Sequence, residues 1–190
     1  MRNKKFTQMK KQIIKKTFLE RNSVIVAEEL LGKFLVRKIG SKKISLMITE
    51  TEAYDGFQDK ASHASRGRTK RNAPMFGPAG RWYVYFIYGT HWMLNIVCGK
   101  NGYPSAFLIR GAGDISGPAR LTKFLKIGKK FNNAKAAIKT GLWLEDGGVK
   151  IKPAEIKKLP RIGVAYAGPV WSKKPYRFAL PNGKKSVNVT

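Results

Sequence analysis

Residues 44–54 read ISLMITETEAY, and this stretch decides how the sequence around it folds. Its β-branched and apolar residues, bounded by a Gly-Ser pair at 40–41 and by Gly56, are typical of a long β-strand. In a strand every second side chain lies on the same face. That face runs from apolar to acidic to aromatic, as from a core to the mouth of a pocket: Ile44, Leu46, Ile48, Glu50, Glu52 and Tyr54.

Acidic residues are scarce in this chain, yet they gather at the end of this strand. The sequence has 38 Lys and Arg against 11 Asp and Glu. Four of these acids lie within ten residues, Glu50, Glu52, Asp55 and Asp59, and they are followed by His63, one of 2 histidines. We interpret this cluster as one built for chemistry. The alternative is a solvated strand end and turn, since most charge clusters are solvated.

The composition bounds the class of protein. A chain of 190 residues with 43% hydrophobic and 11% aromatic residues can bury one sizeable core. The net charge of +27 predicts a polyanionic partner, nucleic acid first and an acidic membrane surface second. No apolar run is long enough to span a membrane, and no signal peptide is expected. Cys98 is the single cysteine, which excludes an intramolecular disulfide and fits a reducing, cytoplasmic compartment.

Further elements follow on either side of this strand. We expect a helix over residues 24–31, capped by Asn22 or Ser23, and a strand over 33–38. Downstream we expect a strand over 105–109, a helix beginning with Ser116 as its cap and ending at Gly128, and a strand or edge element over 142–146. Residues 153–159 are expected to form a short helix or loop. Two last strands are expected over 161–166 and 176–180.

The most aromatic block, residues 81–98, is expected to form a hairpin around Gly89-Thr90. Alternation predicts that Tyr83, Tyr85 and Ile87 share one face and that Trp82, Val84, Phe86 and Tyr88 share the other. We interpret Trp82 and Phe86 as core, and Tyr88 as a residue at the protruding tip. Asn95 is an amide among apolar residues, so it must find hydrogen bonds or destabilise its strand.

Two groups of basic residues are expected near the acidic cluster. Arg110 follows an apolar strand, and a half-buried arginine needs an anion, for which Glu50 and Glu52 are the candidates. The loop at 66–71 reads RGRTKR, which predicts a phosphate clamp formed by Arg66, Arg68, Lys70 and Arg71. A flexible solvated loop is the alternative. We expect residues 1–18 to form a basic N-terminal arm ahead of a single domain at 19–190.

Several chemistries are disfavoured by what the sequence lacks. It contains no phosphate loop, no dinucleotide fingerprint and no serine elbow motif, and one Cys with 2 His cannot supply a deaminase zinc site. A metal-dependent nuclease stays open, because four acids could converge. The favoured chemistry is a carboxylate that activates water beside aromatic rings, which suits hydrolysis of an N-glycosidic bond in a flipped nucleotide. Tyr88 at the hairpin tip has the shape of a wedge that fills the gap left by the base.

A family resemblance joins these pieces. The sequence resembles the alkyladenine (3-methyladenine) DNA glycosylases from about Leu19 to Leu180, through motifs that occur in the family's order and spacing. They are ETEAY at 50–54 with His63, RNAPMF at 71–76, YVYFIYG at 83–89, Asn95, LIR at 108–110, GPARL at 117–121, RIGV at 161–164 and PYRF at 175–178. Residues 111–114 and 168–171 depart from the family pattern, which bears on the pocket rim and on substrate range.

The resemblance implies an α+β fold, a single domain built on a curved antiparallel sheet with flanking helices, and no metal or cofactor. It also implies catalytic roles for Glu52 as general base and for His63 and Arg110, which would hold the attacking water. Tyr54 and His63 would stack on one face of the flipped base and Tyr85 on the other. Tyr88 would intercalate, and Asn95 would disfavour guanine. Glu50 is expected to have a structural hydrogen-bonding role.

The implied activity is monofunctional excision of alkylated or deaminated purines, of the 3-methyladenine, hypoxanthine and ethenoadenine class, as the first step of base excision repair. The partner is damaged double-stranded DNA, with no membrane, and the protein is expected to be a monomer. The expected location is the nucleoid in a bacterium or the nucleus in a eukaryote. Two other hypotheses remain open: a non-catalytic basic nucleic-acid-binding module, and a bifunctional glycosylase with lyase activity through a lysine.

Overall fold

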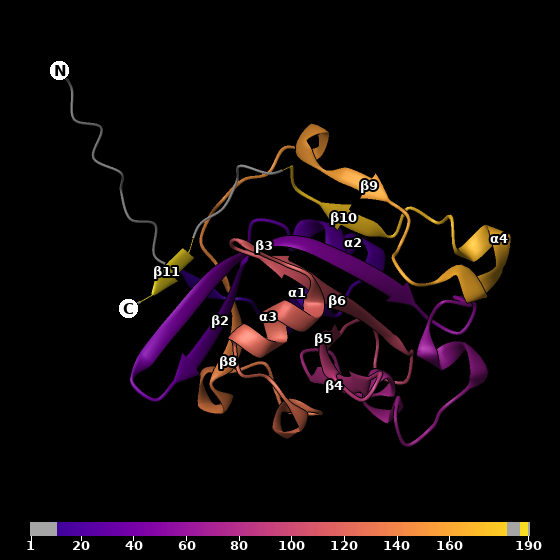
Figure 1. The fold of residues 1–190 in the computed structure, drawn as a ribbon, viewed down its shortest axis with the longest axis horizontal. Helices are drawn as coiled ribbons and strands as arrows, with labels where there is room; N and C mark the ends of the chain where they lie inside the picture. Colours follow the sequence, from indigo (N-terminus) through magenta and orange to yellow (C-terminus); the bar gives the residue numbers. More distant parts are fainter. Residues whose placement is uncertain (1–10, 182–186, 190) are drawn as a thin grey trace.

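The fold is organised around one long strand, β3 (Lys42–Asp55), which crosses the whole sheet (Figure 1). The computed structural model describes residues 11–181 and 187–189. Within these ranges eleven strands form one sheet, and every pairing is antiparallel. The predicted α+β class with a single antiparallel sheet is confirmed.

β3 is paired along both of its edges, first by one set of strands and then by another. Its first half pairs with β2 (Phe34–Ile39) on one edge and with β11 (Val187–Val189) on the other. Its second half pairs with β6 (Ser105–Ala112) and β10 (Arg177–Ala179). The register against β6 shifts on both sides of Glu50. Such irregularities bend and twist a strand, which gives the sheet its curvature where the acidic cluster begins.

The remaining strands extend the sheet on both sides of β3. The order is β1-β8-β2-β3-β6-β5-β4, with β1 at Gln12–Ile13, β8 at Leu142–Asp146, β5 at His91–Val97 and β4 at Trp82–Ile87. Two short strands lie off this path: β7 (Ile115–Ser116) pairs with β6, and β9 (Lys157–Leu159) pairs with β10.

Two helices lie against the sheet, with α2 behind β3 and α3 in front of β5 and β6 in Figure 1. α2 (Ser23–Glu29) begins where the side chain of Asn22 accepts hydrogen bonds from the amides of Val24 and Ile25, as the sequence predicted for a polar cap. α3 (Pro118–Phe124) has Pro118 in its first turn. The short helical segments are α1 (Lys16–Leu19), α4 (Gly168–Trp171) and six 3₁₀ turns, η1 (His63–Arg66), η2 (Ala73–Phe76), η3 (Lys129–Phe131), η4 (Ile138–Thr140), η5 (Pro153–Glu155) and η6 (Ala165–Ala167).

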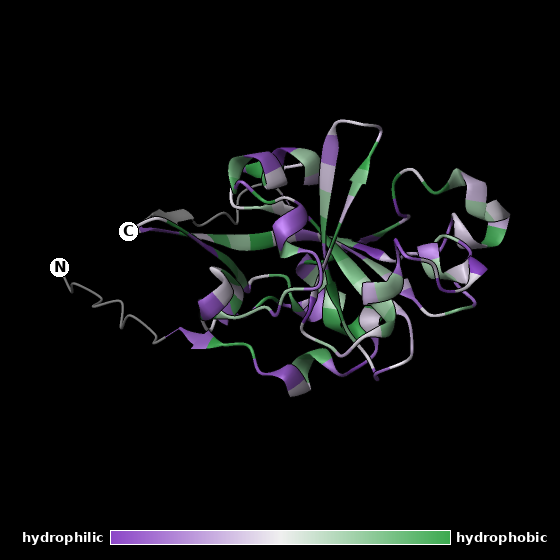
Figure 2. Cartoon of the chain, turned by 90° about the horizontal axis from the view of Figure 1, so that it is seen from below, coloured by the Kyte–Doolittle hydropathy of each residue, from purple (hydrophilic) through white to green (hydrophobic). Residues whose placement is uncertain are grey.

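The main core lies along the central strands, which Figure 2 colours largely green. Leu46 and Ile48 of β3 are fully buried, as are Trp82 of β4 and Phe107 of β6. The thiol of Cys98 is also fully buried, and burial raises its pKa to about 12. Cys98 is therefore a core residue, and such a thiol is no nucleophile.

The β4–β5 hairpin protrudes from the body of the molecule (Figure 2), so some of its aromatic residues are buried and others are exposed. Tyr83, Tyr85 and Ile87 lie together on the face of a cavity described below, as alternation predicted. Trp82 is core, also as predicted, but Phe86 is 42% exposed. The prediction that Phe86 is core is wrong, because its half of the hairpin extends beyond the core and its ring lies against Trp92, which is itself only partly buried, at 4.7 Å between ring centroids.

Three other predictions need correction. Residues 161–166 form no strand: the amide of Ile162 donates to a side chain of the cavity, and Gly163 has φ +76° before the turn η6. Ser116 does not cap α3, because it pairs with Gly111 as part of β7, and the cap is Gly117. α3 also ends at Phe124, ahead of the expected Gly128.

Part of the predicted basic arm at 1–18 belongs to the folded body. Residues 1–10 lie outside the described residues. Gln12 and Ile13 pair with Asp146 and Glu145 of β8, and Phe18 packs against the core. The division of the chain at residue 18 stays a prediction. In the described part of the chain, no helix has the length and apolar character needed to cross a membrane.

Candidate active site

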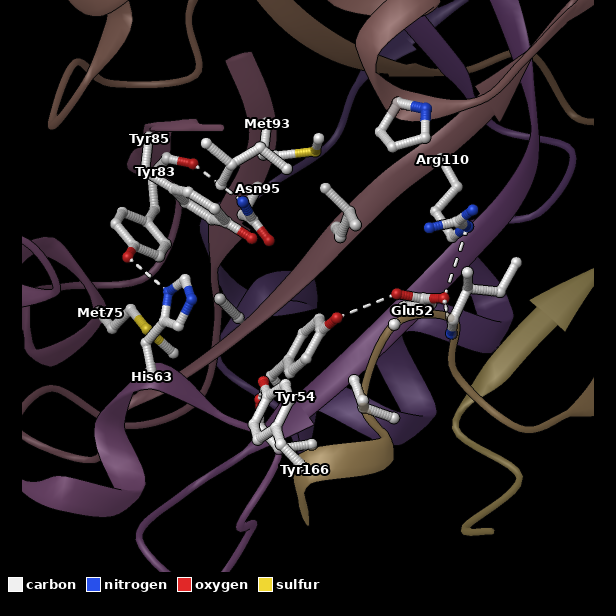
Figure 3. A pocket seen from close by; sticks show the side chains of 18 of the residues that line it. Glu52, Tyr54, His63, Met75, Tyr83, Tyr85, Met93, Asn95, Arg110 and Tyr166 are labelled. Atoms are coloured by element: carbon white, nitrogen blue, oxygen red, sulfur yellow. Dashed lines mark hydrogen bonds and ion pairs between the residues drawn. The ribbon is translucent and has the colours of Figure 1, made fainter. Parts of the chain in front are cut away.

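A cavity of about 290 Å³ opens where β3, β4, β5 and β6 meet the segment at 162–166 (Figure 3). Its volume is at the lower end of the range for ligand pockets, roughly 300–1,000 Å³. All the predicted catalytic and base-binding residues line it: Glu52, Tyr54, His63, Tyr85, Asn95 and Arg110. Other lining residues include Met75, Tyr83, Tyr88, Met93, Pro118, Ile162 and Tyr166.

Glu52 is fully buried at one end of this cavity and is held by three groups. The Tyr54 hydroxyl donates to Oε2 at 2.9 Å, and the amide of Ile162 donates to Oε1 at 2.8 Å. Nε of Arg110 lies 3.4 Å from Oε1. β3 brings Glu52 and Tyr54 to the same face, and the pairing with β6 brings Arg110 beside them. The carboxylate is therefore fixed in orientation by partners from three segments.

These partners also set the ionisation of Glu52. Burial raises the pKa of its carboxyl above the ordinary value, because the charged form loses water. Arg110, the Ile162 amide and the Tyr54 hydroxyl lower the pKa, since they favour the charge, while nearby Glu50 raises it. A buried carboxylate with a raised pKa suits a general base.

Arg110 contacts two carboxylates, as the sequence allowed. Its Nε lies 3.2 Å from Oε1 of Glu50 as well as 3.4 Å from Oε1 of Glu52. Glu50 also accepts a hydrogen bond from Nη1 of Arg177 at 3.0 Å. The predicted structural hydrogen-bonding role of Glu50 fits these contacts. Two arginines and two acids form a cluster of balanced charge, which limits the cost of burying Glu52.

The opposite wall of the cavity is aromatic (Figure 3). Nδ1 of His63 lies 3.0 Å from the Tyr83 hydroxyl, and the His63 ring contacts Tyr85 edge to face, with 4.7 Å between centroids. The ring centroids of Tyr83 and Tyr85 lie 5.0 Å apart. Tyr83 was missed as a site residue, although alternation along β4 assigned it to the face of Tyr85. No contact joins His63 to Glu52, and the two lie across the cavity from each other.

His63 is neutral at physiological pH. The residue is exposed at the cavity rim, but its ring lies against Tyr83 and Tyr85. Loss of water there lowers the pKa of its imidazole, and the cation of Arg71 lowers it further. A neutral imidazole offers a stacking face and one hydrogen-bond donor, but it does not offer a fixed positive charge.

Asn95 finds the hydrogen bond that its burial requires. It is 2% exposed, and its Nδ2 donates to the backbone oxygen of Tyr83 at 3.2 Å. This bond turns the carbonyl end of the amide toward the cavity in Figure 3. β5 therefore presents one oriented polar group on an otherwise apolar wall.

Tyr88 stands at the tip of the hairpin, as its place beside the Gly89-Thr90 turn predicted. The face that alternation assigned to it, that of Trp82 and Phe86, is wrong, because β4 ends at Ile87 and Tyr88 lines the cavity. It is 88% exposed and also lines the cavity mouth. Its φ is +52°, a backbone conformation that is rare and strained for a bulky residue. Retaining an exposed tyrosine in a strained turn points to a contact with a partner, because nothing in the fold requires it there.

The basic loop lies beside the aromatic wall. Arg71 donates from Nη2 to the backbone oxygen of Phe86 at 3.1 Å and lies over the Tyr85 ring at 5.2 Å. The side chain of Arg68 lies 5.8 Å from the centroid of Phe76. Arg66 and Lys70 are exposed. Arg71 thus lies beside the hairpin that carries Tyr88, whereas Arg68 and Lys70 line a separate hollow next to Phe76.

The four clustered acids do not converge on one point. Glu50 and Glu52 bind Arg110, whereas Asp55 accepts hydrogen bonds from Asn22 and Ser23. Asp59 is fully buried against Arg161. Over the described ranges, no three His, Cys, Asp or Glu side chains group as a metal site would. This arrangement weakens the nuclease hypothesis, which needs converging acids.

Comparison with known proteins places the chain in a family. The family model described as methylpurine-DNA glycosylase matches residues 17–116 and 114–184. A relative from Anaeromyxobacter dehalogenans strain 2CP-C is 44% identical over 173 residues, covering 86% of this chain and 81% of the relative. A relative from Methanocella arvoryzae is 41% identical and covers 87% and 91%, and one from Ehrlichia chaffeensis is 39% identical and covers 93% and 98%.

All three relatives carry the provisional name 3-methyladenine DNA glycosylase. The identity extends over most of each protein, and the residues that the family model matches include those that line the cavity. The chain belongs to the methylpurine-DNA glycosylase family, a family of hydrolases that act on DNA.

Proposed function

We propose that this protein is a monofunctional glycosylase that hydrolyses the N-glycosidic bond of alkylated or deaminated purines flipped out of duplex DNA. The observation that carries the proposal is the environment of Glu52, a buried carboxylate fixed by Tyr54, Ile162 and Arg110 at the end of an aromatic cavity. The names of the relatives support the substrate class, and the net charge of +27 supports DNA as the partner.

In the proposed reaction Glu52 removes a proton from a water molecule, which attacks the anomeric carbon as the bond to the base breaks. The carboxylate also stabilises the positive charge that develops on the sugar. Arg110 orients Glu52 from the side of β6. The part of His63 in holding the water stays a prediction, because His63 contacts the aromatic wall on the far side of the cavity.

The base is proposed to stack between Tyr54 and His63 on one side and Tyr85 on the other. A flat base that stacks between two rings lies roughly 3.5 Å from each of them, so the two rings must be about twice that distance apart. His63 and Tyr85 lie 4.7 Å apart in edge-to-face contact, so one of them must turn when the base enters. His63 begins the short turn η1 and is exposed at the rim, so it is the ring that we expect to move.

The amide of Asn95 supports discrimination among purines. It lines the cavity opposite Leu108 in the β5–β6 pairing, and its Nδ2 donates to the backbone oxygen of Tyr83. A guanine carries an exocyclic amine that adenine and hypoxanthine lack, and we propose that Asn95 disfavours guanine by crowding that amine. The basic residues Arg66, Arg68, Lys70 and Arg71 are proposed to bind the phosphates on either side of the flipped nucleotide.

The direct test is to incubate the protein with duplexes that carry hypoxanthine, ethenoadenine or 3-methyladenine and to look for alkali-sensitive sites. Excision of at least one base is expected, with undamaged duplex as the control. Binding that ignores lesions and leaves no abasic product would favour the non-catalytic module instead. Borohydride trapping of a protein–DNA Schiff base would favour the lyase hypothesis, and we expect none, because a carboxylate and water need no amine.

Replacing Tyr88 with Ser is expected to weaken binding to lesion-containing duplex by roughly tenfold to a hundredfold, because the unstacking of a few kcal/mol is no longer offset by an inserted ring. Competition binding and the single-turnover excision rate would measure the effect. The chemical step on a lesion in single-stranded DNA should change little, since Glu52 is untouched. Tyr103→Ser is the matched control, because Tyr103 is exposed and lies outside the cavity. Equal losses in both variants would contradict the wedge.

The excision rate is expected to rise with pH through the pKa of Glu52, because the general base acts in its ionised form. Burial raises this pKa, so the acidic limb of the pH–rate profile lies above the ordinary range of a glutamate. Tyr54→Phe keeps the ring but removes a hydroxyl that lowers the pKa, so its acidic limb moves to higher pH. Single-turnover rates over the acidic pH range test this, with Tyr103→Phe as the control. A limb that does not move would count against Tyr54 as a partner of Glu52.

A further inference from the structure

Beside the cavity lies a buried ion pair that contacts β3 at Ala53 and Tyr54 and also the loop that leads to His63. Arg161 and Asp59 both have fully buried side chains. Both terminal nitrogens of Arg161 bind the Asp59 carboxylate, with Nη2 donating to Oδ1 at 2.8 Å. The two residues are 102 positions apart in the sequence, so the pair joins distant parts of the chain.

The pair holds β3 on the side away from the cavity. Nη1 of Arg161 also donates to the backbone oxygen of Ala53 at 2.8 Å, between Glu52 and Tyr54. Its guanidinium carbon lies 4.9 Å from the centroid of the Tyr54 ring and 5.3 Å from that of Tyr176. One face of Tyr54 is therefore covered by a fixed planar cation, which leaves the other parts of the ring to the cavity.

The same pair fixes the two loops that complete the site. Asp59 accepts hydrogen bonds from the amides of Asp55 and Ala61, both at 3.1 Å, and its backbone oxygen accepts one from Ser62. These bonds orient the turn that begins at His63. On the other side, the residue after Arg161 is Ile162, whose amide donates to Glu52 at 2.8 Å.

Stability alone gives no good account of this arrangement. The desolvation of two buried charges largely offsets their attraction, and apolar residues often stabilise a core as well. The fork of an arginine, however, fixes several acceptors at once, which a lysine or an apolar residue cannot do. The proposed reaction depends on the orientation of a carboxylate and of an aromatic face, and an arginine that fixes several acceptors at once can set both orientations.

We propose that Arg161 and Asp59 are positioning residues for the glycosylase reaction: their ion pair sets the Tyr54 ring and the Ile162 amide relative to Glu52. This inference rests on the proposed function, since neither residue touches the substrate in it. The pair acts through Tyr54 and Ile162, which are hydrogen-bond partners of the general base Glu52. Its loss should therefore slow the chemical step and shift the ionisation of Glu52, and it should leave DNA affinity nearly intact.

Arg161→Lys tests the proposal, because it keeps the charge but loses the fork. We expect the single-turnover excision rate to fall roughly tenfold to a hundredfold, as displacements near 1 Å do. The acidic limb of the pH–rate profile should move to higher pH, because the Ile162 amide that lowers the pKa of Glu52 is no longer held against it. Affinity for lesion duplex should stay within a few-fold of wild type.

Lys158→Gln is the matched control. Lys158 lies on β9, away from the cavity, and pairs with Glu28 of α2 near the surface. Because the substitution removes only that cation, the rate and the pH profile of this variant should equal those of wild type. If Arg161→Lys does not fold, Asp59→Asn is measured against the same criteria, because it keeps the shape of the carboxyl and removes its charge.

The inference is overturned if the folded variant excises at the wild-type rate, or if the rate falls with an unmoved acidic limb. In the second case the pair would act only on stability, which a melting temperature would register. The two proposals fail separately. Wild-type protein without excision activity contradicts the function itself, whereas active wild type with an unaffected Arg161→Lys variant contradicts only the positioning role.

Discussion

Glu52→Gln is expected to lose base excision by at least about 10²–10⁴-fold, the usual contribution of a general base, while it still binds lesion-containing duplex. A glutamine amide has nearly the shape of the carboxylate, so it keeps an oxygen that can accept from the Ile162 amide. It cannot take a proton from water, and it carries no charge to stabilise the sugar cation. The loss should therefore fall on the chemical step and not on affinity.

The variant should fold, because its arginine partner keeps another anion. Arg110 lies 3.2 Å from Glu50 as well as 3.4 Å from Glu52, so removing one charge does not leave a buried cation unpaired. Single-turnover excision and equilibrium binding on the same duplex separate the two effects. Glu29→Gln is the control, since Glu29 is exposed and pairs with Arg21 at the surface, away from the cavity. Turnover retained by Glu52→Gln would remove the central residue of the proposal.

Trp82→Ala is expected to lower the free energy of unfolding by about 3–5 kcal/mol, the range for truncating a large buried aromatic side chain. Trp82 is fully buried at the start of β4, and its indole Nε1 donates to the backbone oxygen of Leu142 at 3.1 Å. The substitution leaves a cavity at the junction between the hairpin and β8, and the Leu142 carbonyl loses its indole donor and keeps the Thr140 hydroxyl, at 3.3 Å. Both effects destabilise the native state.

Phe86→Ala on the same strand is the matched comparison. Phe86 is 42% exposed and contacts mainly Trp92, so its loss should cost about 1 kcal/mol, the value of an exposed aromatic pair. Urea or thermal unfolding of both variants measures the difference. Similar losses would mean that the hairpin tip is packed as tightly as its base, contrary to the exposure of Phe86.

Much of the fold and of the site follows from local sequence, because alternation is a property of the strand backbone itself. It assigned Glu52 and Tyr54 to one face of β3, and Tyr85 and Ile87 to one face of β4, and the structure brings these faces together around one cavity. The apolar neighbours of Asn95 also required a hydrogen bond for its amide, which the backbone of Tyr83 supplies.

The alternation could not say where the hairpin leaves the body of the protein, and for that reason it misassigned Phe86. It also misassigned residues 161–166, whose β-branched composition resembles a strand. In the folded chain the backbone of Ile162 donates to a side chain 110 residues away, in place of a neighbouring strand. A local pattern cannot register such a partner, because the partner is set by the order of strands in the sheet.

The sequence by itself determined the long acidic strand, the aromatic hairpin with Tyr88 at its tip, and the family to which the chain belongs. Only the tertiary structure decided which groups hold Glu52, and that Asp59 is paired with Arg161 beneath Tyr54 instead of joining the other acids. The physical reason is the distance along the sequence over which each effect acts. Backbone periodicity acts over a few residues, whereas the ionisation and orientation of a buried group depend on charges and donors that folding brings from more than 100 residues away.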